Sequence, residues 1–241
     1  MPIQIKKINW ECPDNIKAFH TTRIGGSSKG LFKYSNLSFD VGDGQTNVKK
    51  NRKELKQLLK LEVDPCWMKQ IHSSYVKKVV SSVNDIVCDA SYTQTKGLAC
   101  AVLSADCLPI LVCDKLGTKV GVIHTGWRGL HNGIIKKFMN KFSKSPKDII
   151  CWIGPSISPV NYVVREDVYK KLSKISPKIF NQLDDEHWNL DLKSGAKTVL
   201  KSLGIKKIYS DDMCTFQNSN LYYSYRRENN TGRIASLIWI E

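Results

Sequence analysis

The sequence predicts an α+β fold formed by a single domain over residues 1–241, and three observations support this. The chain has 241 residues, 41% of them hydrophobic, which suits one compact domain with a sizeable core. No internal repeat and no linker rich in Pro, Gly or Ser divides it. Strand-like segments outnumber helical ones, and several are joined by short turns. This pattern favours mixed β-sheets over a doubly wound parallel sheet.

The first half of the chain alternates loops, one helix and several strands. Glycines punctuate Thr22–Gly30 and Val41–Gly44, which we expect to be loops. Residues Asn47–Leu61 carry apolar side chains at helical spacing and begin with an Asn suited to the N-cap. Apolar runs bounded by polar residues predict strands at Cys66–Gln70, Val76–Val80, Gly97–Leu103, Leu108–Cys113 and Lys119–His124.

In the second half, helical and strand-like segments are mixed. Helices are expected from Leu130 to about Phe142, at Asp167–Leu172 and at Leu192–Leu203, the last of them closing at Gly204. Strands are expected at Ile149–Ile153, Ile208–Ser210, Leu221–Tyr225 and Ala235–Ile240.

The formal net charge is +15, with a pI near 9.4, which raises the question of a nucleic-acid partner. The lysines are scattered in pairs along expected solvent faces, without a long basic tract. We therefore expect a lysine-rich surface and no nucleic-acid partner. A non-catalytic nucleic-acid-binding module is the alternative that rests on charge alone. Small anionic substrates would still be attracted by this field.

The eight cysteines predict reduced thiols in a cytoplasmic protein. Cys88, Cys100, Cys113 and Cys151 lie inside apolar runs, where a free Cys behaves as a small hydrophobic residue. The N-terminal segment has no apolar core of the kind found in signal peptides. No apolar run approaches the roughly 20 residues that cross a bilayer, so no membrane partner is expected.

Cys107 and His124 lie at the far ends of two strands joined by the short polar segment DKLGT. A turn centred on Lys115–Leu116 would place them directly opposite each other, with Cβ atoms roughly 4.5–5.5 Å apart. This separation suits two ligands of one zinc ion, or a thiol and its base. Taken singly, each residue also fits a packing role in the core.

A catalytic zinc needs a third protein ligand and one open position. Of the five histidines, His72 shares the strand-end setting of His124, and we expect it to be that ligand. His20 is expected to pack, whereas His131 and His187 are expected to be exposed. Asp106 and the segment after His124 are polar or glycine-rich, which suits the rim of a pocket. Arg128 is a candidate contact for an anion.

Several motifs together resemble the laccase-domain family that includes bacterial YfiH and mammalian FAMIN. They are QIHSSYV, SADCLPILVCD, VIHTGWRGL, IGPSIS, CTFQ and SYRRENNTGRIASLIWI, and the likeness extends from Thr21 to the last strand. Members have been called polyphenol oxidases, purine nucleoside phosphorylases with adenosine deaminase activity, and peptidoglycan editing factors. The resemblance implies a zinc ion on His72, Cys107 and His124. It also implies an α/β/β/α layered arrangement similar to the catalytic domain of cytotoxic necrotising factor.

Some positions depart from the family pattern. Thr125 stands where the family usually has Ala, and Ser73 where it usually has Gly. Asn161, Val163 and Arg165 stand where the family tends to have Cys, Glu and Gly. We expect these three to affect substrate specificity, while the three implied metal ligands are unchanged.

The first functional hypothesis is a zinc-dependent purine nucleoside enzyme with one zinc per chain. It would carry out phosphorolysis of adenosine, inosine and methylthioadenosine to base plus ribose 1-phosphate, and deamination of adenosine by a zinc-bound hydroxide. Asp106 or Asp89 is the candidate carboxylic acid for proton transfer. The candidate substrate contacts are Arg23, Arg128 and Arg227 for the anion, with Asn36 and Gln70 for sugar or base.

Two further chemistries stay open. Cys107 could be a thiolate nucleophile with His124 as its base, in an amide hydrolase that edits peptidoglycan precursors. A copper-dependent phenol oxidase is the other, but a laccase needs many histidines, often in His-x-His pairs, and this chain has five and no such pair. Any copper would therefore occupy the same three residues. The expected assembly is a monomer or homodimer.

Overall fold

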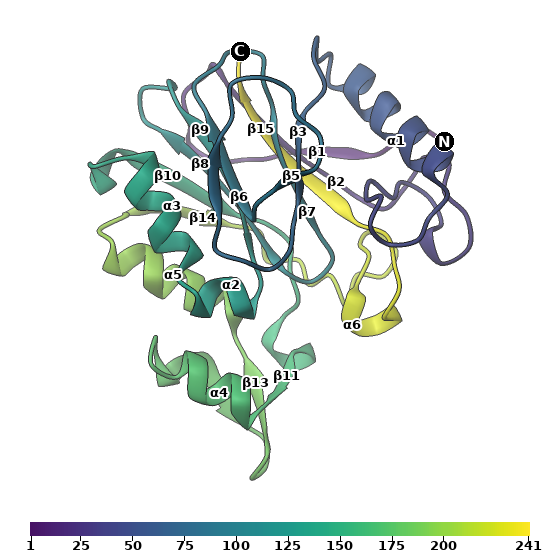
Figure 1. The fold of residues 1–241 in the computed structure, drawn as a ribbon. Helices are drawn as coiled ribbons and strands as arrows, with labels where there is room; N and C mark the ends of the chain where they lie inside the picture. Colours follow the sequence, from purple (N-terminus) through teal and green to yellow (C-terminus); the bar gives the residue numbers. More distant parts are fainter.

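The computed structural model describes all 241 residues, and two six-stranded mixed sheets form its centre (Figure 1). The first sheet has the order β1 (Ile5–Lys7), β2 (Ile16–Thr21), β15 (Ile234–Ile240), β7 (Cys100–Ser104), β3 (Cys66–Lys69) and β5 (Ile86–Val87). The second has the order β14 (Lys207–Ser210), β10 (Ile149–Ile153), β8 (Leu108–Asp114), β9 (Val120–Thr125), β6 (Ala90–Thr93) and β4 (Val76–Lys78).

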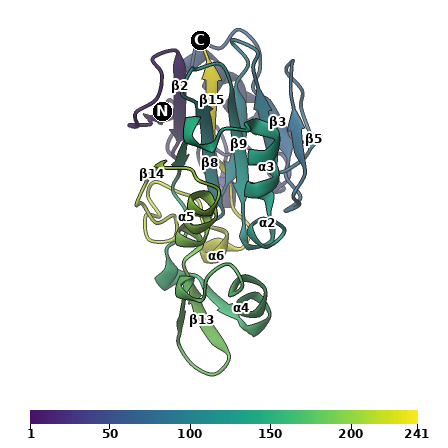
Figure 2. The same cartoon turned by 90° about the vertical axis from the view of Figure 1, so that its left-hand side faces the viewer.

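A small third sheet projects from one end of the molecule together with one helix (Figure 2). Its order is β11 (Val163–Arg165), β13 (His187–Leu190) and β12 (Phe180–Gln182), and helix α4 (Glu166–Leu172) follows β11. All three strands pair antiparallel. Short 3-10 turns occur at Gly30–Phe32, Pro146–Asp148, Pro159–Asn161 and Pro177–Ile179.

Helices cover the outer faces of the two large sheets, giving four layers (Figure 1). Helix α1 (Gln45–Leu58) packs Leu55 into an apolar cluster with Leu237 and Trp239 of β15. Helices α2 (Trp127–His131), α3 (Ile134–Phe142) and α5 (Leu192–Ser202) pack against the outer face of the second sheet. This arrangement confirms the expected α+β fold with α/β/β/α layers.

The two large sheets bury a second apolar cluster between them. Alternate residues of each strand point into it, such as Val102 on β7 and Val122 on β9. Strands β9 and β10 are buried on both faces, because the helices cover the other side. This explains why they are nearly continuous apolar runs in the sequence.

Three expectations about elements were wrong. The expected helix from Leu130 to Phe142 is two helices, because Gly133 adopts a φ of +74° between α2 and α3. Helix α1 begins two residues earlier than expected, with Gly44 at its N-cap in place of Asn47. Leu221–Tyr225 is no strand; Tyr225 begins the short helix α6 (Tyr225–Glu228).

The register of the β8–β9 hairpin also differs from the expected one. Pro109 pairs with His124 and Leu108 with Thr125, so the turn is centred on Leu116–Gly117. Asp114 fixes this turn: its carboxylate accepts hydrogen bonds from the backbone N–H groups of Thr118 and Lys119. The shift is two residues, so His124 keeps its face of the sheet. Cys107 lies just beyond the start of β8 and does not pair with His124.

None of the helices has the length and apolar character needed to cross a lipid bilayer.

Candidate metal centre and its cavity

His124 lies near the end of β9 on the face directed at the first sheet. Its Nδ1 is 2.9 Å from Oδ1 of Asp89, a carboxylate with no solvent exposure. Because a carboxylate accepts hydrogen bonds, Nδ1 carries a proton, and Nε2 is the nitrogen that can bind a metal once its own proton has left. The backbone N–H of His124 also donates to the carbonyl of Asp89, at 2.7 Å. Asp89 therefore holds both the imidazole ring and the backbone of His124 in place.

His72 lies in the turn after β3 and has a φ of +57°, which is rare for a residue with a side chain. The Asp89 carboxylate holds this conformation. It accepts hydrogen bonds from the backbone N–H groups of Ile71, His72 and Ser73, and from the Ser73 hydroxyl. Asp89 thus orients two histidines that are far apart in the sequence, as carboxylates behind metal-binding histidines do.

Cys107 follows Asp106, whose φ is +92°. The Asp106 carboxylate accepts hydrogen bonds from the hydroxyls of Thr215 and Ser224 and from the backbone N–H of Arg226. This network ties the segment before β8 to the C-terminal part of the chain. It keeps the backbone at Asp106 in its unusual conformation and turns Cys107 toward the histidines.

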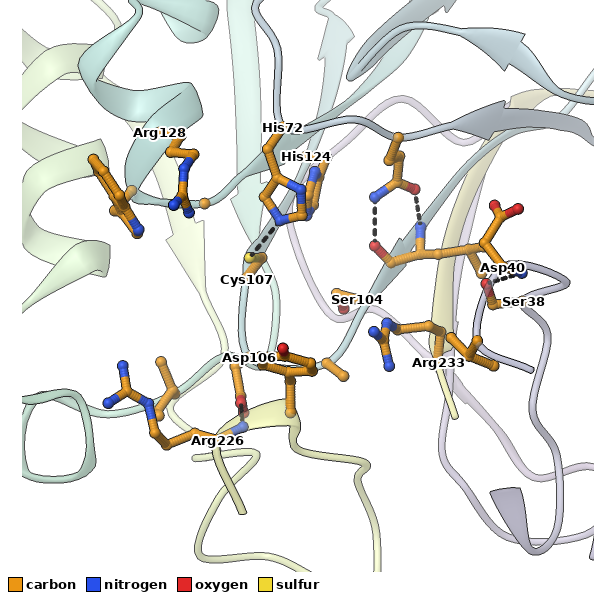
Figure 3. A pocket seen from close by; sticks show the side chains of 18 of the residues that line it. Ser38, Asp40, His72, Ser104, Asp106, Cys107, His124, Arg128, Arg226 and Arg233 are labelled. Carbon is orange, nitrogen blue, oxygen red and sulfur yellow. Dashed lines mark hydrogen bonds between the residues drawn. The ribbon is translucent and has the colours of Figure 1, made fainter. Parts of the chain in front are cut away.

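The three predicted metal ligands converge (Figure 3). The ligand atoms of His72, Cys107 and His124 all lie within 4.8 Å of one another. Cys107 Sγ is 3.9 Å from His72 Nε2, and the two imidazole rings are 4.9 Å apart at 73°. Tetrahedral ligands of one zinc ion stand roughly 3.5 Å apart, so a small contraction suffices. Two imidazoles and one thiol match the donors of catalytic zinc sites.

Gly126 makes room for this arrangement. A Cβ at this position would lie 2.9 Å from Cys107 Sγ and 3.3 Å from His72 Cδ2. Any side chain there would push the thiol and imidazole out of place, so the motif HTGWRG requires glycine for steric reasons.

The electrostatics of the site favour an ionised thiol. Burial raises the pKa of Cys107, but the charge of His124 and hydrogen bonds with His124 and His72 outweigh it and bring the pKa to about 6. Burial lowers the pKa of His124, yet the Cys107 charge and the hydrogen bond to Asp89 raise it to about 9. A thiolate is the form of cysteine that binds metal and attacks electrophiles.

The three ligands lie on the wall of a cavity of about 700 Å³, a size that suits a nucleoside or a similar small molecule. Polar and aromatic side chains line the rest of it. They come from the loop before α1, from strand ends near the metal ligands, from α2, from the segment before β11 and from the C-terminal segment: Ser38, Asp40, Gln70, Ser104, Trp127, Arg128, Tyr162, Tyr225, Arg226 and Arg233.

Of the predicted substrate contacts, Arg128 and Gln70 line this cavity. The Gln70 amide is engaged, because it donates to the carbonyl of Leu103 and accepts from the N–H of the same residue. Arg128 is exposed, and its guanidinium makes no hydrogen bond or ion pair with the protein but lies 4.3 Å from the Trp127 ring centre. Arg128 is therefore the predicted contact that remains available to a ligand.

Arg23, Asn36 and Arg227 do not line the cavity; most of their polar atoms bond to loops instead. Arg227 donates to three backbone carbonyls and to Glu228. Arg23 contacts the same Glu228 and the carbonyl of Ser219. Asn36 accepts from the backbone N–H of Arg233 and so positions a residue that does line the cavity. These three residues therefore hold loops of the protein and are not expected to contact a ligand in the cavity.

Tyr162, Arg226 and Arg233 are cavity residues that sequence reasoning missed. The sequence offered a signal in the run SYRRENNTGR, from which only Arg227 was selected. In α6, successive residues point in different directions, so Arg226 lies toward the cavity while Arg227 turns to the carbonyls behind it. The sequence predicts a strand at Leu221–Tyr225 and no helix after it, so it does not indicate that Arg226 and Arg227 point in different directions.

The remaining candidate residues lie outside the cavity. His131 is exposed at the end of α2, and His187 lies beside Asp184 on the small sheet. Of the family departures, Asn161 donates to Ser158 and to Cys214 Sγ, whereas Val163 and Arg165 line an adjoining cavity of about 400 Å³.

Comparison with known proteins agrees with the resemblance seen in the motifs. The family described as multi-copper polyphenol oxidoreductase laccase matches residues 17–241. A Haemophilus influenzae protein named purine nucleoside phosphorylase is 38% identical over 97% of this chain and 98% of its own. The Escherichia coli purine nucleoside phosphorylase YfiH is 36% identical over 96% of each chain.

Solved structures share the fold. A crystal structure of a Neisseria meningitidis protein superposes with a TM-score of 0.92 and 34% identity, covering 98% of this chain and 99% of that one. YlmD from Geobacillus stearothermophilus gives a TM-score of 0.87 and 30% identity, covering 95% and 93%.

Proposed function

This chain belongs to the multi-copper polyphenol oxidoreductase laccase family, and from that premise we propose that it is a zinc-dependent purine nucleoside phosphorylase that also deaminates adenosine. The names of its bacterial relatives support the phosphorolytic activity. In phosphorolysis the bond between the base and ribose C1′ breaks and a bond from C1′ to a phosphate oxygen forms, giving base and ribose 1-phosphate. Adenosine, inosine and methylthioadenosine are the proposed substrates.

The observation that carries the proposal is the convergence of His72, Cys107 and His124 on the wall of a nucleoside-sized cavity. When bound there, a zinc ion supplies Lewis-acid chemistry and lowers the pKa of coordinated water. Hydrolytic deamination of adenosine consumes one water and releases ammonia, and needs such activation at C6.

The chain's own residues orient and hold charge around the reacting atoms. Asp89 keeps the proton of His124 on Nδ1, so that Nε2 faces the other two ligands. Asp106 uses both carboxylate oxygens in hydrogen bonds, and we assign it a positioning role for Cys107 in place of proton transfer. Tyr225, on the side of Arg233, offers an aromatic ring against which a purine can pack.

A second candidate is an amide hydrolase with Cys107 as nucleophile, favoured by the low pKa of the Cys107 thiol and its closeness to His124. The two candidates differ in what the thiolate does, since a metal-bound sulfur resists alkylation until chelation. A multi-copper oxidase has less support, because His72, Cys107 and His124 form the single group of three or more metal-ligating side chains in the structure.

Metal analysis combined with nucleoside assays tests the proposal. We expect about one zinc per chain. We expect phosphate-dependent release of base from inosine and adenosine, and loss of both metal and activity in His72→Ala. His131→Ala, which removes an exposed histidine outside the cavity, is the matched control and should retain both. A metal-free protein with full activity would contradict the proposal.

A further inference from the structure

Three arginines, Arg128, Arg226 and Arg233, line the cavity around the metal ligands, and none forms an ion pair. Of the two carboxylates that line it, Asp106 is fully engaged in hydrogen bonds, and Asp40 lies on the side of Arg233 (Figure 3). The arginines on the other side of the cavity are therefore not tied to a carboxylate by an ion pair.

That other side is formed by Arg128 and Arg226. Each guanidinium lies over an aromatic ring: Arg128 is 4.3 Å from the centre of Trp127, and Arg226 is 5.1 Å from that of Tyr162. Trp127, Tyr162 and Arg226 also line the adjoining cavity together, so the two rings and the guanidinium groups they carry belong to one part of the site.

The donor capacity of the two guanidinium groups is largely free. The Arg226 guanidinium donates one hydrogen bond, to the carbonyl of Val163, and the Arg128 guanidinium makes no hydrogen bond with the protein. Stacking on a ring holds a guanidinium plane in place and leaves its edge free to donate. Two such edges suit a tetrahedral oxyanion, which arginine binds through paired hydrogen bonds.

The opposite side has different chemistry. Arg233 uses its guanidinium to donate to the carbonyls of Thr231 and Gly232, and Ser38 and Asp40 lie beside it (Figure 3). A carboxylate repels phosphate but accepts hydrogen bonds from sugar hydroxyls. Cys107, between the two sides, marks the place where their occupants would meet.

We propose that Arg128 and Arg226 form the binding subsite for inorganic phosphate, and that the ribose hydroxyls of the nucleoside bind on the Ser38 and Asp40 side. This assignment rests on the proposed function. It gives the two substrates separate sides of one cavity, so that C1′ lies between the bound phosphate and the base it will lose.

The test is the binding of inorganic phosphate, measured by calorimetry on the purified protein, in Arg128→Met and Arg226→Met. We expect each variant to weaken phosphate binding about 10-fold to 100-fold, as expected for lost hydrogen bonds to a charged group. The KM for phosphate should rise by a similar factor, while the KM for inosine stays within about twofold because its contacts are unchanged. Arg226→Lys, which keeps the charge but loses the paired geometry, should show an intermediate loss.

Lys136→Met is the charge-matched control, because Lys136 is an exposed cation on α3 that does not line this cavity. It should bind phosphate like the wild type. An equal loss in Lys136→Met would show that overall positive charge, and no defined subsite, attracts the anion. Unchanged phosphate binding in both Arg128→Met and Arg226→Met, or no phosphate binding by the wild type, would overturn the assignment.

Failure of the subsite and failure of the proposed function give different results. If the wild type cleaves nucleosides with phosphate while the two arginine variants keep its KM for phosphate, the subsite is wrong and the function stands. If phosphate binds in an arginine-dependent way but no nucleoside is cleaved, the anion site stands and the proposed function is wrong. Deamination of adenosine uses no phosphate, so it should persist in Arg226→Met and show that the variant is folded.

Discussion

Two buried histidines occupy the inner faces of the two large sheets. They are equally buried but have different neighbours and different pKa values. His124 on β9 is 4% exposed, and His20 on β2 is 3% exposed. His124 has the fully buried Asp89 carboxylate at 2.9 Å. His20 stacks on the Tyr222 ring and lies tilted against Trp152; its Nδ1 has no hydrogen-bond partner, and its Nε2 is 3.9 Å from Asp211.

These surroundings give the two imidazoles opposite charge preferences. Burial lowers the pKa of His20 to about 4, and the distant Asp211 does not compensate. The pKa of His124 is about 9, because Cys107 and Asp89 outweigh its burial. The difference shows that the carboxylate and thiol beside His124, and not its burial, decide its preferred charge.

Asp89→Asn should remove the carboxylate that distinguishes the surroundings of His124 from those of His20. The amide cannot accept from the His124 ring and from three backbone N–H groups while keeping its own N–H₂ satisfied. We expect zinc affinity to fall about 10-fold to 100-fold, and the free energy of unfolding to fall by on the order of 3 kcal/mol. Competition with a chelator and urea unfolding measure the two effects. Zinc affinity within twofold of wild type would show that Asp89 does not orient the ligands.

Acid should destabilise the protein through His20. Its pKa is lowered on folding, so between pH 6.5 and 4 the unfolded chain binds more protons than the folded one. The free energy of unfolding therefore decreases as the pH is lowered through this range. The change from 6.5 to about 4 corresponds to about 3 kcal/mol at pH 4.

His20→Phe keeps a ring between Trp152 and Tyr222 and removes this titration. The loss of unfolding free energy from pH 7 to pH 4 should therefore be about 3 kcal/mol smaller in the variant than in the wild type. Denaturant unfolding at both pH values measures it. Equal losses in the two proteins would mean that His20 is protonated in the folded state.

Thiol alkylation should distinguish the metal site from the packed cysteines. Without metal, Cys107 should react with iodoacetamide about tenfold or more faster than Cys12, whose pKa is raised by burial. Buried thiols such as Cys100 and Cys151 should stay unmodified in the folded protein. Peptide mass spectrometry identifies the modified residue. Added zinc should protect Cys107; rapid alkylation in the zinc-loaded protein would favour the nucleophile hypothesis instead.

Asp211→Asn should have the smallest effect and is the matched control for Asp89→Asn. His20 is neutral at pH 7, so the pair at 3.9 Å contributes little. An Asn can still accept the hydrogen bond from the N–H of Met213. We expect a change in unfolding free energy below about 0.5 kcal/mol and unchanged zinc content. A large loss in this variant would mean that the environment of His20 is charged, which would remove the contrast with His124.

Sequence reasoning predicted the convergence of Cys107 and His124 although it placed the turn one position too early along each strand. The resulting register error was two residues, and strand faces alternate with a period of two, so His124 kept its face. The position of His72 followed from its strand-end setting and from the family resemblance.

Asp89, Arg226 and Arg233 were not assigned their roles from the sequence. The carboxylate of Asp89 meets His124 across a separation of 35 residues, and Arg226 lies beside the segment before β8 through a contact spanning 120 residues. Local patterning carries no information about such contacts. Asp89 was considered as an acid near the metal, whereas its oxygens are committed to holding the turn at His72.

By itself, the sequence determined the α+β class, most strands and the metal-ligating residue types, because these follow from periodicity, turn chemistry and donor identity, which are local properties. The tertiary structure alone decided which arginines face the cavity, which carboxylate orients the histidines and which buried histidine is charged. Those outcomes depend on distances of a few ångströms between segments far apart in the chain, where desolvation and hydrogen bonding set the energy of a charge.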